Sequence, residues 1–190
     1  LPMQWGGRIV PINTFSSEIL RKLHKETTIG KLNSDQFLLS FLSMPQMWMQ
    51  VPFIAVANKE ISRHYRLPND YCAYFQLFDE DGDYRLMPKL KEAYSKAPME
   101  RTGFDKDLIK LDERVNIVFR LLNRQMLCIF PHPTDPTPTW YAPGDDLSTF
   151  PTEDSLFITR SVTWYLNEIN HSLRSGDWNN PNRLLQVIGE

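Results

Sequence analysis

Long apolar runs are absent from this chain of 190 residues. A transmembrane helix needs about 20 consecutive apolar residues. The most apolar window, residues 37–56, is interrupted by Pro45, Gln46, Gln50 and Pro52, so we do not expect the chain itself to span a membrane. Runs of basic charge are absent too, because lysine and arginine are scattered and the formal net charge is −2. This charge balance argues against a nucleic-acid-binding protein, which would show a basic face.

Cysteine is scarce, with only Cys72 and Cys128 in the chain. Their wide separation fits neither a C-x-x-C redox pair nor a zinc site, and no C-x-x-C-H heme-attachment motif is present. The sequence leaves open whether they form a disulfide. The chain also lacks the H-E-x-x-H, G-x-S-x-G, P-loop and G-x-G-x-x-G motifs. We therefore expect no catalytic residues in this domain.

The acidic run at residues 79–83 does not fit a calcium-binding loop. An EF-hand loop that begins at Asp79 needs glycine at its sixth position and glutamate at its twelfth. Those positions hold Tyr84 and Leu90. We therefore expect an acidic turn without a metal ion.

Apolar side chains make up 42% of the chain, which is enough to bury a substantial core. The clearest element is a helix over residues 104–126, whose apolar seam consists of Phe104, Leu108, Leu111, Val115, Val118 and Leu122. Other patterns predict helices over residues 34–43, 59–65, 71–78, 88–96 and 152–174, with Thr152 as a cap. They also predict a short turn or helix over 181–188 and a buried strand or extended segment over 51–57. The predicted fold is mainly α: a single helical domain over residues 1–190 with a small N-terminal β-hairpin and a long Pro-rich loop.

The first two dozen residues predict a turn, a strand and a helix in close succession. Gly6 and Gly7 can supply the positive φ angles of a tight hairpin turn. Pro11 ends the short strand that follows because it lacks a backbone donor. Thr14 or Ser16 is expected to cap the next helix.

The same segment carries a family resemblance. Its motif residues follow the order G-R-x-x-P-x-x-T-x-x-x-E-x-x-R, and they are Gly7, Arg8, Pro11, Thr14, Glu18 and Arg21. This order resembles the opening of a large extracytoplasmic segment in cytochrome c biogenesis proteins of the system II type, in which ResB-like and CcsA-like halves are fused. The similarity continues through residues 32–36, 48–52, 104–106, 112–116 and 175–178. Within the motif, we expect Arg8 and Glu18 to form a structural clasp between strand and helix.

The resemblance implies a location and a role. The chain would be a piece of a longer membrane protein, with transmembrane helices on both sides and this domain on the periplasmic face of the inner membrane. The full protein would move heme to the outer face and present it to the thiols of apocytochrome c. This domain would act as a scaffold or apocytochrome-docking surface. Its partners would be apocytochrome c and the flanking transmembrane parts, and heme would be a cofactor of the parent protein rather than of this domain.

Residues 130–151 are rich in proline and predict a long, ordered surface loop. Loops of this length are often functional. We expect its docking residues to be Trp140 and Tyr141, both exposed, together with Pro133 and Pro138. The alternative is an aromatic-anchored crossover that only covers the core.

The histidines leave another function open. His132 lies between two prolines, and a histidine on such a loop can serve as an axial heme ligand. The tryptophan-rich W-G-x-x-W-x-W-D heme signature of the family is, however, missing from the chain. One alternative is therefore a heme-binding module that uses His132 or His24. The other is a secreted helical protein unrelated to heme.

Overall fold

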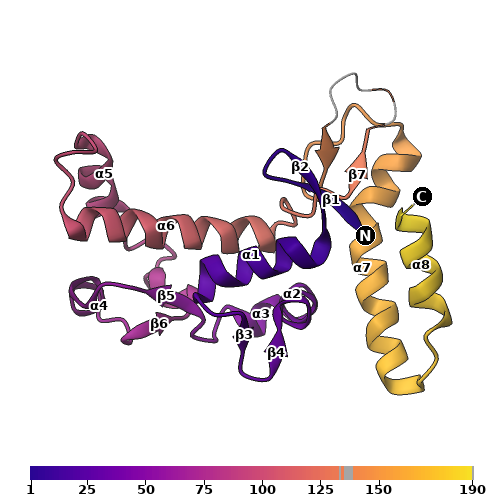
Figure 1. Ribbon diagram of the computed structural model, residues 1–190, viewed down its shortest axis with the longest axis horizontal. Coiled ribbons are helices and arrows are strands. Elements are labelled where there is room, and N and C mark those ends of the chain that lie inside the picture. Colours follow the sequence, from indigo (N-terminus) through magenta and orange to yellow (C-terminus); the bar gives the residue numbers. More distant parts are fainter. Residues whose placement is uncertain (133, 135–138, 190) are drawn as a thin grey trace. The chain divides into compact units, whose positions relative to one another are not determined.

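The computed structural model of the chain describes residues 1–132, 134 and 139–189. These residues form eight α-helices, one short 3₁₀ helix and four two-stranded antiparallel sheets, so the prediction of a mainly α fold is confirmed. The chain divides into two compact units (Figure 1): a terminal unit, Leu1–Ser16 with Arg120–Glu190, and a central unit, Ser17–Phe119. The prediction of a single domain is therefore not confirmed.

The terminal unit begins with the expected hairpin. Strand β1 (Pro2–Trp5) pairs with β2 (Arg8–Pro11) in antiparallel register. Gly6 and Gly7 connect them with φ angles of 58° and 74°, and two successive left-handed residues are what a type I′ hairpin turn requires. The prediction of an N-terminal β-hairpin is confirmed.

Helix α1 (Ile12–His24) begins earlier than expected, directly after β2. Thr14 and Ser16 therefore lie inside the helix, and the prediction that one of them caps it is wrong. The Ser16 hydroxyl donates to the carbonyl of Asn13, three residues earlier (3.0 Å). Serine side chains commonly make such a bond within a helical turn. The hairpin delivers the chain straight into the helix, so no separate capping residue intervenes.

The remainder of the terminal unit contains one further hairpin and two helices: β7 (Phe130–Pro131), β8 (Trp140–Tyr141), α7 (Thr152–Ser175) and α8 (Asn179–Gly189). The two helices pack against each other. Thr152 is the first helical residue of α7 and Pro151 occupies the cap, so the predicted Thr152 cap is wrong. Gly176, with φ 77°, ends α7.

The central unit combines short strands with several helices: β3 (Thr28–Ile29), β4 (Leu32–Asn33), α2 (Ser34–Ser43), α3 (Pro45–Trp48), β5 (Ile54–Val56), α4 (Lys59–Tyr65), β6 (Asp70–Cys72), the 3₁₀ helix η1 (Tyr74–Leu77), α5 (Met87–Ser95) and most of α6 (Gly103–Leu122). Helices α2 and α4 match their predicted bounds. Asn33 caps α2 through a reciprocal pair of hydrogen bonds with Gln36 (2.9 and 3.0 Å).

The predicted helix over residues 71–78 does not form, so this prediction is wrong. Residues Asp70–Cys72 form strand β6 instead, and only Tyr74–Leu77 make a single 3₁₀ turn. Strand β6 pairs with β5, which is fully buried. The partner strand satisfies the backbone of this segment, and a local pattern does not reveal such a partner.

Four buried aromatic side chains pack together in this unit: Phe37 and Phe41 on α2, Trp48 on α3, and Phe53. Their ring centroids lie 4.9–6.1 Å apart, within the range at which edge-to-face pairs are favourable. The Trp48 indole N–H donates to the Ser40 hydroxyl (2.9 Å). This cluster fixes the short segments of the unit around one packed centre.

Candidate functional site

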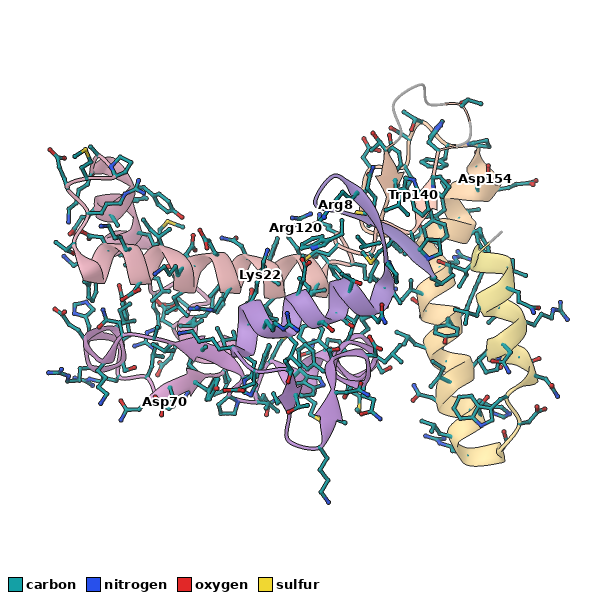
Figure 2. All side chains as sticks on the ribbon, viewed as in Figure 1. Arg8, Lys22, Asp70, Arg120, Trp140 and Asp154 are labelled. Atoms are coloured by element: carbon teal, nitrogen blue, oxygen red, sulfur yellow. The ribbon has the colours of Figure 1, made fainter. Side chains whose placement is uncertain are left out.

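The β7–β8 hairpin organises the described part of the predicted docking loop. Trp140 lies on β8 (Figure 2). Its backbone N–H donates to the side-chain oxygen of Gln4 on β1 (3.0 Å). Trp140 and Tyr141 are half-buried, so they are less accessible than predicted. Pro133 and Pro138 lie outside the described residues. The docking role of these four residues stays a prediction.

His132 belongs to an aromatic cluster with Tyr141 and Phe150. Its ring lies 4.3 Å from Phe150 and 5.9 Å from Tyr141. The Thr134 N–H donates to Nδ1 (3.3 Å), so Nε2 carries the proton and donates to the Thr149 carbonyl (3.3 Å). Ligation of iron by His132 would therefore require one of these hydrogen bonds to break.

His24 has a different environment, at the end of α1. Its Nδ1 lies 3.1 Å from the Phe53 carbonyl, and its ring lies 4.3 Å from Tyr71. A carbonyl only accepts, so Nδ1 carries the proton and the lone pair is on Nε2. Among the described residues, no group of three or more His, Cys, Asp or Glu side chains could hold a metal ion.

The motif residues of the opening segment follow the hairpin into α1: Gly7 in the turn, Arg8 and Pro11 at the ends of β2, and Thr14, Glu18 and Arg21 along α1. Gly7 has a left-handed φ, and this explains why glycine occupies the position. Arg8 is exposed on the hairpin (Figure 2). The clasp between Arg8 and Glu18 stays a prediction.

Both cysteines are free thiols. Burial raises the pKa of Cys72 to about 12 and also raises the pKa of Cys128. The thiolate is the reactive form of cysteine. Both residues are therefore protonated, poor nucleophiles near neutral pH.

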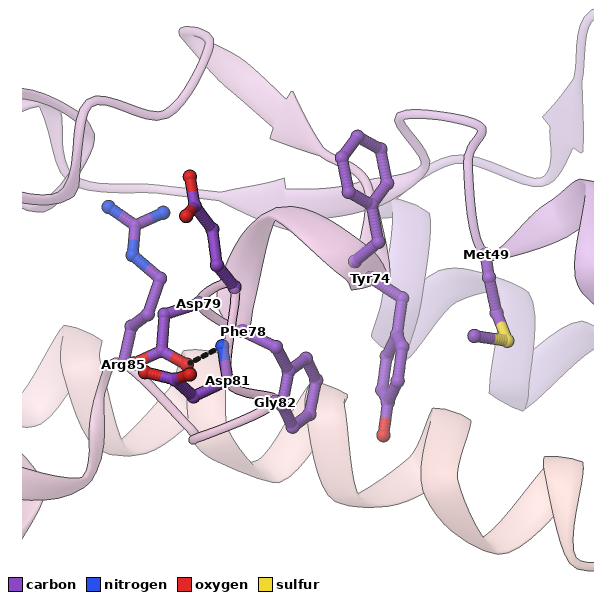
Figure 3. A pocket seen from close by; sticks show the side chains of 9 residues that line it. Met49, Tyr74, Phe78, Asp79, Asp81, Gly82 and Arg85 are labelled. Carbon is purple, nitrogen blue, oxygen red and sulfur yellow. Dashed lines mark hydrogen bonds between the residues drawn. The ribbon is translucent and has the colours of Figure 1, made fainter.

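The central unit contains a pocket of about 930 Å³ that the sequence did not reveal (Figure 3). Apolar and acidic residues line it together: Met49, Tyr74, Phe75, Phe78, Asp79, Glu80, Asp81, Gly82 and Arg85. A second pocket of about 320 Å³ shares Met49 and Phe75 with it and adds Gln46 and Gln50. The signal in the sequence is that the aromatic run at residues 71–78 directly precedes the acidic run at residues 79–83.

The aromatic wall of this pocket is rigidly packed. Phe78 lies between Tyr74 and Tyr84, at centroid distances of 5.0 and 5.3 Å. A β-bridge joins Phe78 to Tyr84 and closes the acidic turn. Phe75, by contrast, is 53% exposed. The pocket therefore has a fixed wall and an accessible apolar side chain beside it.

The acidic turn itself is held by Asp79. Its carboxylate accepts hydrogen bonds from the backbone N–H groups of Asp81 (3.1 Å) and Asp83 (2.8 Å), as Figure 3 shows for Asp81. The prediction of an acidic turn is confirmed. Glu80, Asp81 and Asp83 are exposed, so three carboxylates surround a turn whose backbone is already satisfied.

Arg85 is the cationic residue of the lining, and its guanidinium is used elsewhere. Its two terminal nitrogens donate to the backbone carbonyls of Gln76 and Tyr65 (both 2.5 Å). These two hydrogen bonds hold the segment that follows the acidic turn. Arg85 takes part in none of the ion pairs that the structure describes.

Tyr84, next to the acidic turn, and Tyr94 both donate hydrogen bonds to a carboxylate on α6. Asp112 accepts hydrogen bonds from the hydroxyl of Tyr84 (3.0 Å) and from that of Tyr94 (3.1 Å). Burial, followed by the charge of Asp112, raises the pKa of both tyrosines. These side chains stay neutral hydrogen-bond donors, and they give Asp112 a structural role.

Comparison with known proteins gives one informative similarity. The chain is 33% identical over 135 residues to Protein NrfI of Wolinella succinogenes, a match that covers 70% of this chain and 15% of the relative. The chain therefore spans about 15% of the length of the curated relative that it matches. No protein-family model matches the chain. None of the helices within residues 1–132, 134 and 139–189 has the length and hydropathy that a transmembrane span requires.

The similarity to NrfI supports the resemblance to system II cytochrome c biogenesis proteins. It extends over 70% of the chain. The fused ResB–CcsA arrangement of the parent protein stays a prediction.

Proposed function

We propose that this chain is the periplasmic segment of a membrane-bound, system II cytochrome c biogenesis protein of the fused ResB–CcsA type. The observation that carries the proposal is the similarity to NrfI over 135 residues. In the parent protein, transmembrane helices would flank the segment and anchor it at the periplasmic face of the inner membrane. Heme would be handled by those flanking parts.

Within that protein, the segment acts as a scaffold and as a docking surface for apocytochrome c. Its own side chains support a role without covalent chemistry. Both cysteines have raised pKa values, so they are poorly suited to attack or exchange with client thiols. Both ring nitrogens of His132 are engaged in hydrogen bonds.

The β7–β8 hairpin is the first docking site to test. Trp140 and Tyr141 keep part of their aromatic surface accessible, and partly buried aromatic side chains are common anchors in protein interfaces. The predicted docking set also includes Pro133 and Pro138, which lie outside the described residues.

Replacement of Trp140 by alanine in the parent protein tests this site. The hydrogen bond to Gln4 uses the Trp140 backbone, so the substitution leaves it intact. We expect the yield of heme-attached cytochrome c to fall about fivefold, the effect of losing one interface anchor. Trp164→Ala is the matched control, because Trp164 lies in the same unit on α7 and is 41% exposed. Equal yields from both variants, at equal protein levels, would exclude this docking site.

Heme binding through His24 is the alternative favoured by a specific observation. The hydrogen bond between Nδ1 and the Phe53 carbonyl orients the ring and leaves the Nε2 lone pair for a metal, as in many metal-binding histidines. A hemin titration would then show a sharp Soret shift that His24→Ala abolishes and that His64→Ala retains. Loss of the shift only in His132→Ala would assign the ligand to His132.

The remaining alternative, a secreted protein unrelated to heme, predicts a signal peptide before Leu1 and a stop codon after Glu190 in the reading frame.

A further inference from the structure

The pocket beside the acidic turn combines three properties that a peptide-binding surface needs. The first is accessible apolar surface. Phe75 is 53% exposed at the pocket. Met49 lines both this pocket and its smaller neighbour. A methionine side chain adapts to differently shaped apolar partners, so Met49 and Phe75 together can accept a large apolar side chain.

The second property is net negative charge: Asp79, Glu80 and Asp81 line the pocket together with a single arginine, Arg85, and Asp83 lies in the same turn. Glu80, Asp81 and Asp83 are exposed, and they take part in none of the ion pairs that the structure describes. The Arg85 guanidinium is committed to two backbone carbonyls. A ligand that brings positive charge to this acidic rim would therefore meet exposed carboxylates.

The third property is a preformed shape. The Asp79 carboxylate fixes the turn through two backbone N–H groups, and Phe78 is packed between two tyrosines. A rigid site loses little conformational entropy when a ligand binds. The aromatic wall and the acidic rim are thus held in place before binding.

We propose that this pocket binds an extended polypeptide segment that has a large apolar side chain flanked by lysine or arginine. The apolar side chain lies against Phe75 and Met49, and the flanking cations lie at Glu80, Asp81 and Asp83. The charge of the rim selects this class of segment over neutral or acidic apolar segments. Only the identity of the polypeptide, an unfolded apocytochrome client, rests on the proposed function.

The test uses the whole 190-residue chain and a fluorescein-labelled peptide with central phenylalanines and lysines at both ends. Anisotropy titrations measure the Kd at low and at high salt. The control peptide has glutamate in place of each lysine. We expect the cationic peptide to bind, its affinity to fall with salt, and the acidic peptide to bind at least about tenfold more weakly.

Two variants separate the rim from the apolar wall. The first combines Glu80→Gln, Asp81→Asn and Asp83→Asn, and it retains Asp79 because that carboxylate holds the turn. We expect about a tenfold loss of affinity for the cationic peptide, from three exposed charge pairs of modest strength. The second variant, Phe75→Ser, removes exposed apolar surface, and we expect a loss of similar size.

A matched control removes the same charge elsewhere, through Glu26→Gln, Glu153→Gln and Asp154→Asn, all at exposed positions outside the pocket. Binding that is equally weakened by this control, or unchanged in the rim variant, would overturn the proposal. Equal binding of the acidic and cationic peptides would overturn it as well.

Cytochrome c maturation by the parent protein with the rim variant separates this inference from the proposed function. Weak peptide binding together with reduced maturation supports both the pocket and its client. Weak peptide binding with normal maturation supports the pocket and contradicts the apocytochrome as its client. Unchanged peptide binding refutes the pocket and leaves the hairpin site to its own test with Trp140→Ala.

Discussion

Arg114 is expected to be one of the most sensitive positions of the central unit. Its Nε donates to the Lys22 carbonyl near the end of α1 (2.9 Å), and its Nη1 donates to the Ala55 carbonyl in β5 (3.0 Å). One side chain on α6 therefore joins a helix end and a buried strand. Burial lowers the pKa of this guanidinium, and its hydrogen bonds compensate for lost hydration.

The loss of stability expected on removing the Arg114 side chain follows from these two hydrogen bonds. A hydrogen bond from a charged group contributes about 1.5–3 kcal/mol when partly buried, and the more exposed bond contributes about 0.5–1 kcal/mol. We therefore expect Arg114→Ala to lower the free energy of unfolding by about 3 kcal/mol. Arg114→Lys retains the charge but lacks the planar fork that reaches two separate carbonyls, so it should lose about half as much.

Urea denaturation followed by far-ultraviolet circular dichroism measures both effects. Arg63→Ala is the control, because Arg63 is an exposed arginine on α4, and it should change stability by less than about 0.5 kcal/mol. If Arg114→Ala changed the unfolding free energy as little as the control does, the assigned role of Arg114 would be refuted. If Arg114→Lys were fully stable, the charge alone would suffice and the two-carbonyl argument would fail.

Two further predictions concern an acid-sensitive contact and the hairpin turn. The Lys96 ammonium and the Thr102 backbone lower the pKa of Asp105 from 3.8 to about 2, so the stability from this carboxylate is present above about pH 4 and is lost as pH falls toward 2. In Asp105→Asn the urea midpoint should vary less over that window, and an unchanged pH profile would contradict this assignment. Gly7 has φ 74° and open space where a Cβ would lie, so Gly7→Ala should lower stability by about 1 kcal/mol through backbone strain alone. Gly103→Ala in α6, with the same open space and no positive φ, should be neutral or stabilising, and equal losses for both variants would refute the strain argument.

Residues that carry the family resemblance have structural roles in the central unit. The motif block at residues 112–116 contains Arg114 and Asp112, and both side chains join secondary-structure elements of the central unit. Trp48, in another block, is part of the aromatic core. Several residues that carry the resemblance therefore stabilise the fold. The two surfaces that we propose for binding lie at the β7–β8 hairpin and at the acidic turn.

Local patterns in the sequence determined the elements that depend on neighbours along the chain. The glycine pair at residues 6–7 specified the hairpin turn, and Asn33 with Gln36 specified the start of α2. The apolar spacing of α6 identified its buried face, where Leu108, Leu111, Val115 and Val118 are 0–5% exposed. These features need only contacts within a few residues, so their chemistry is visible in the sequence.

Tertiary structure decided everything that depends on partners distant in sequence. Strand β6 forms because β5 pairs with it, and Trp140 is half-buried on a strand that hydrogen-bonds to the Gln4 side chain. The pocket exists because Met49 lies beside an aromatic wall and an acidic turn some distance along the chain. Composition and periodicity report which residues seek burial, whereas long-range packing selects their partners, and only the latter creates a surface that can bind.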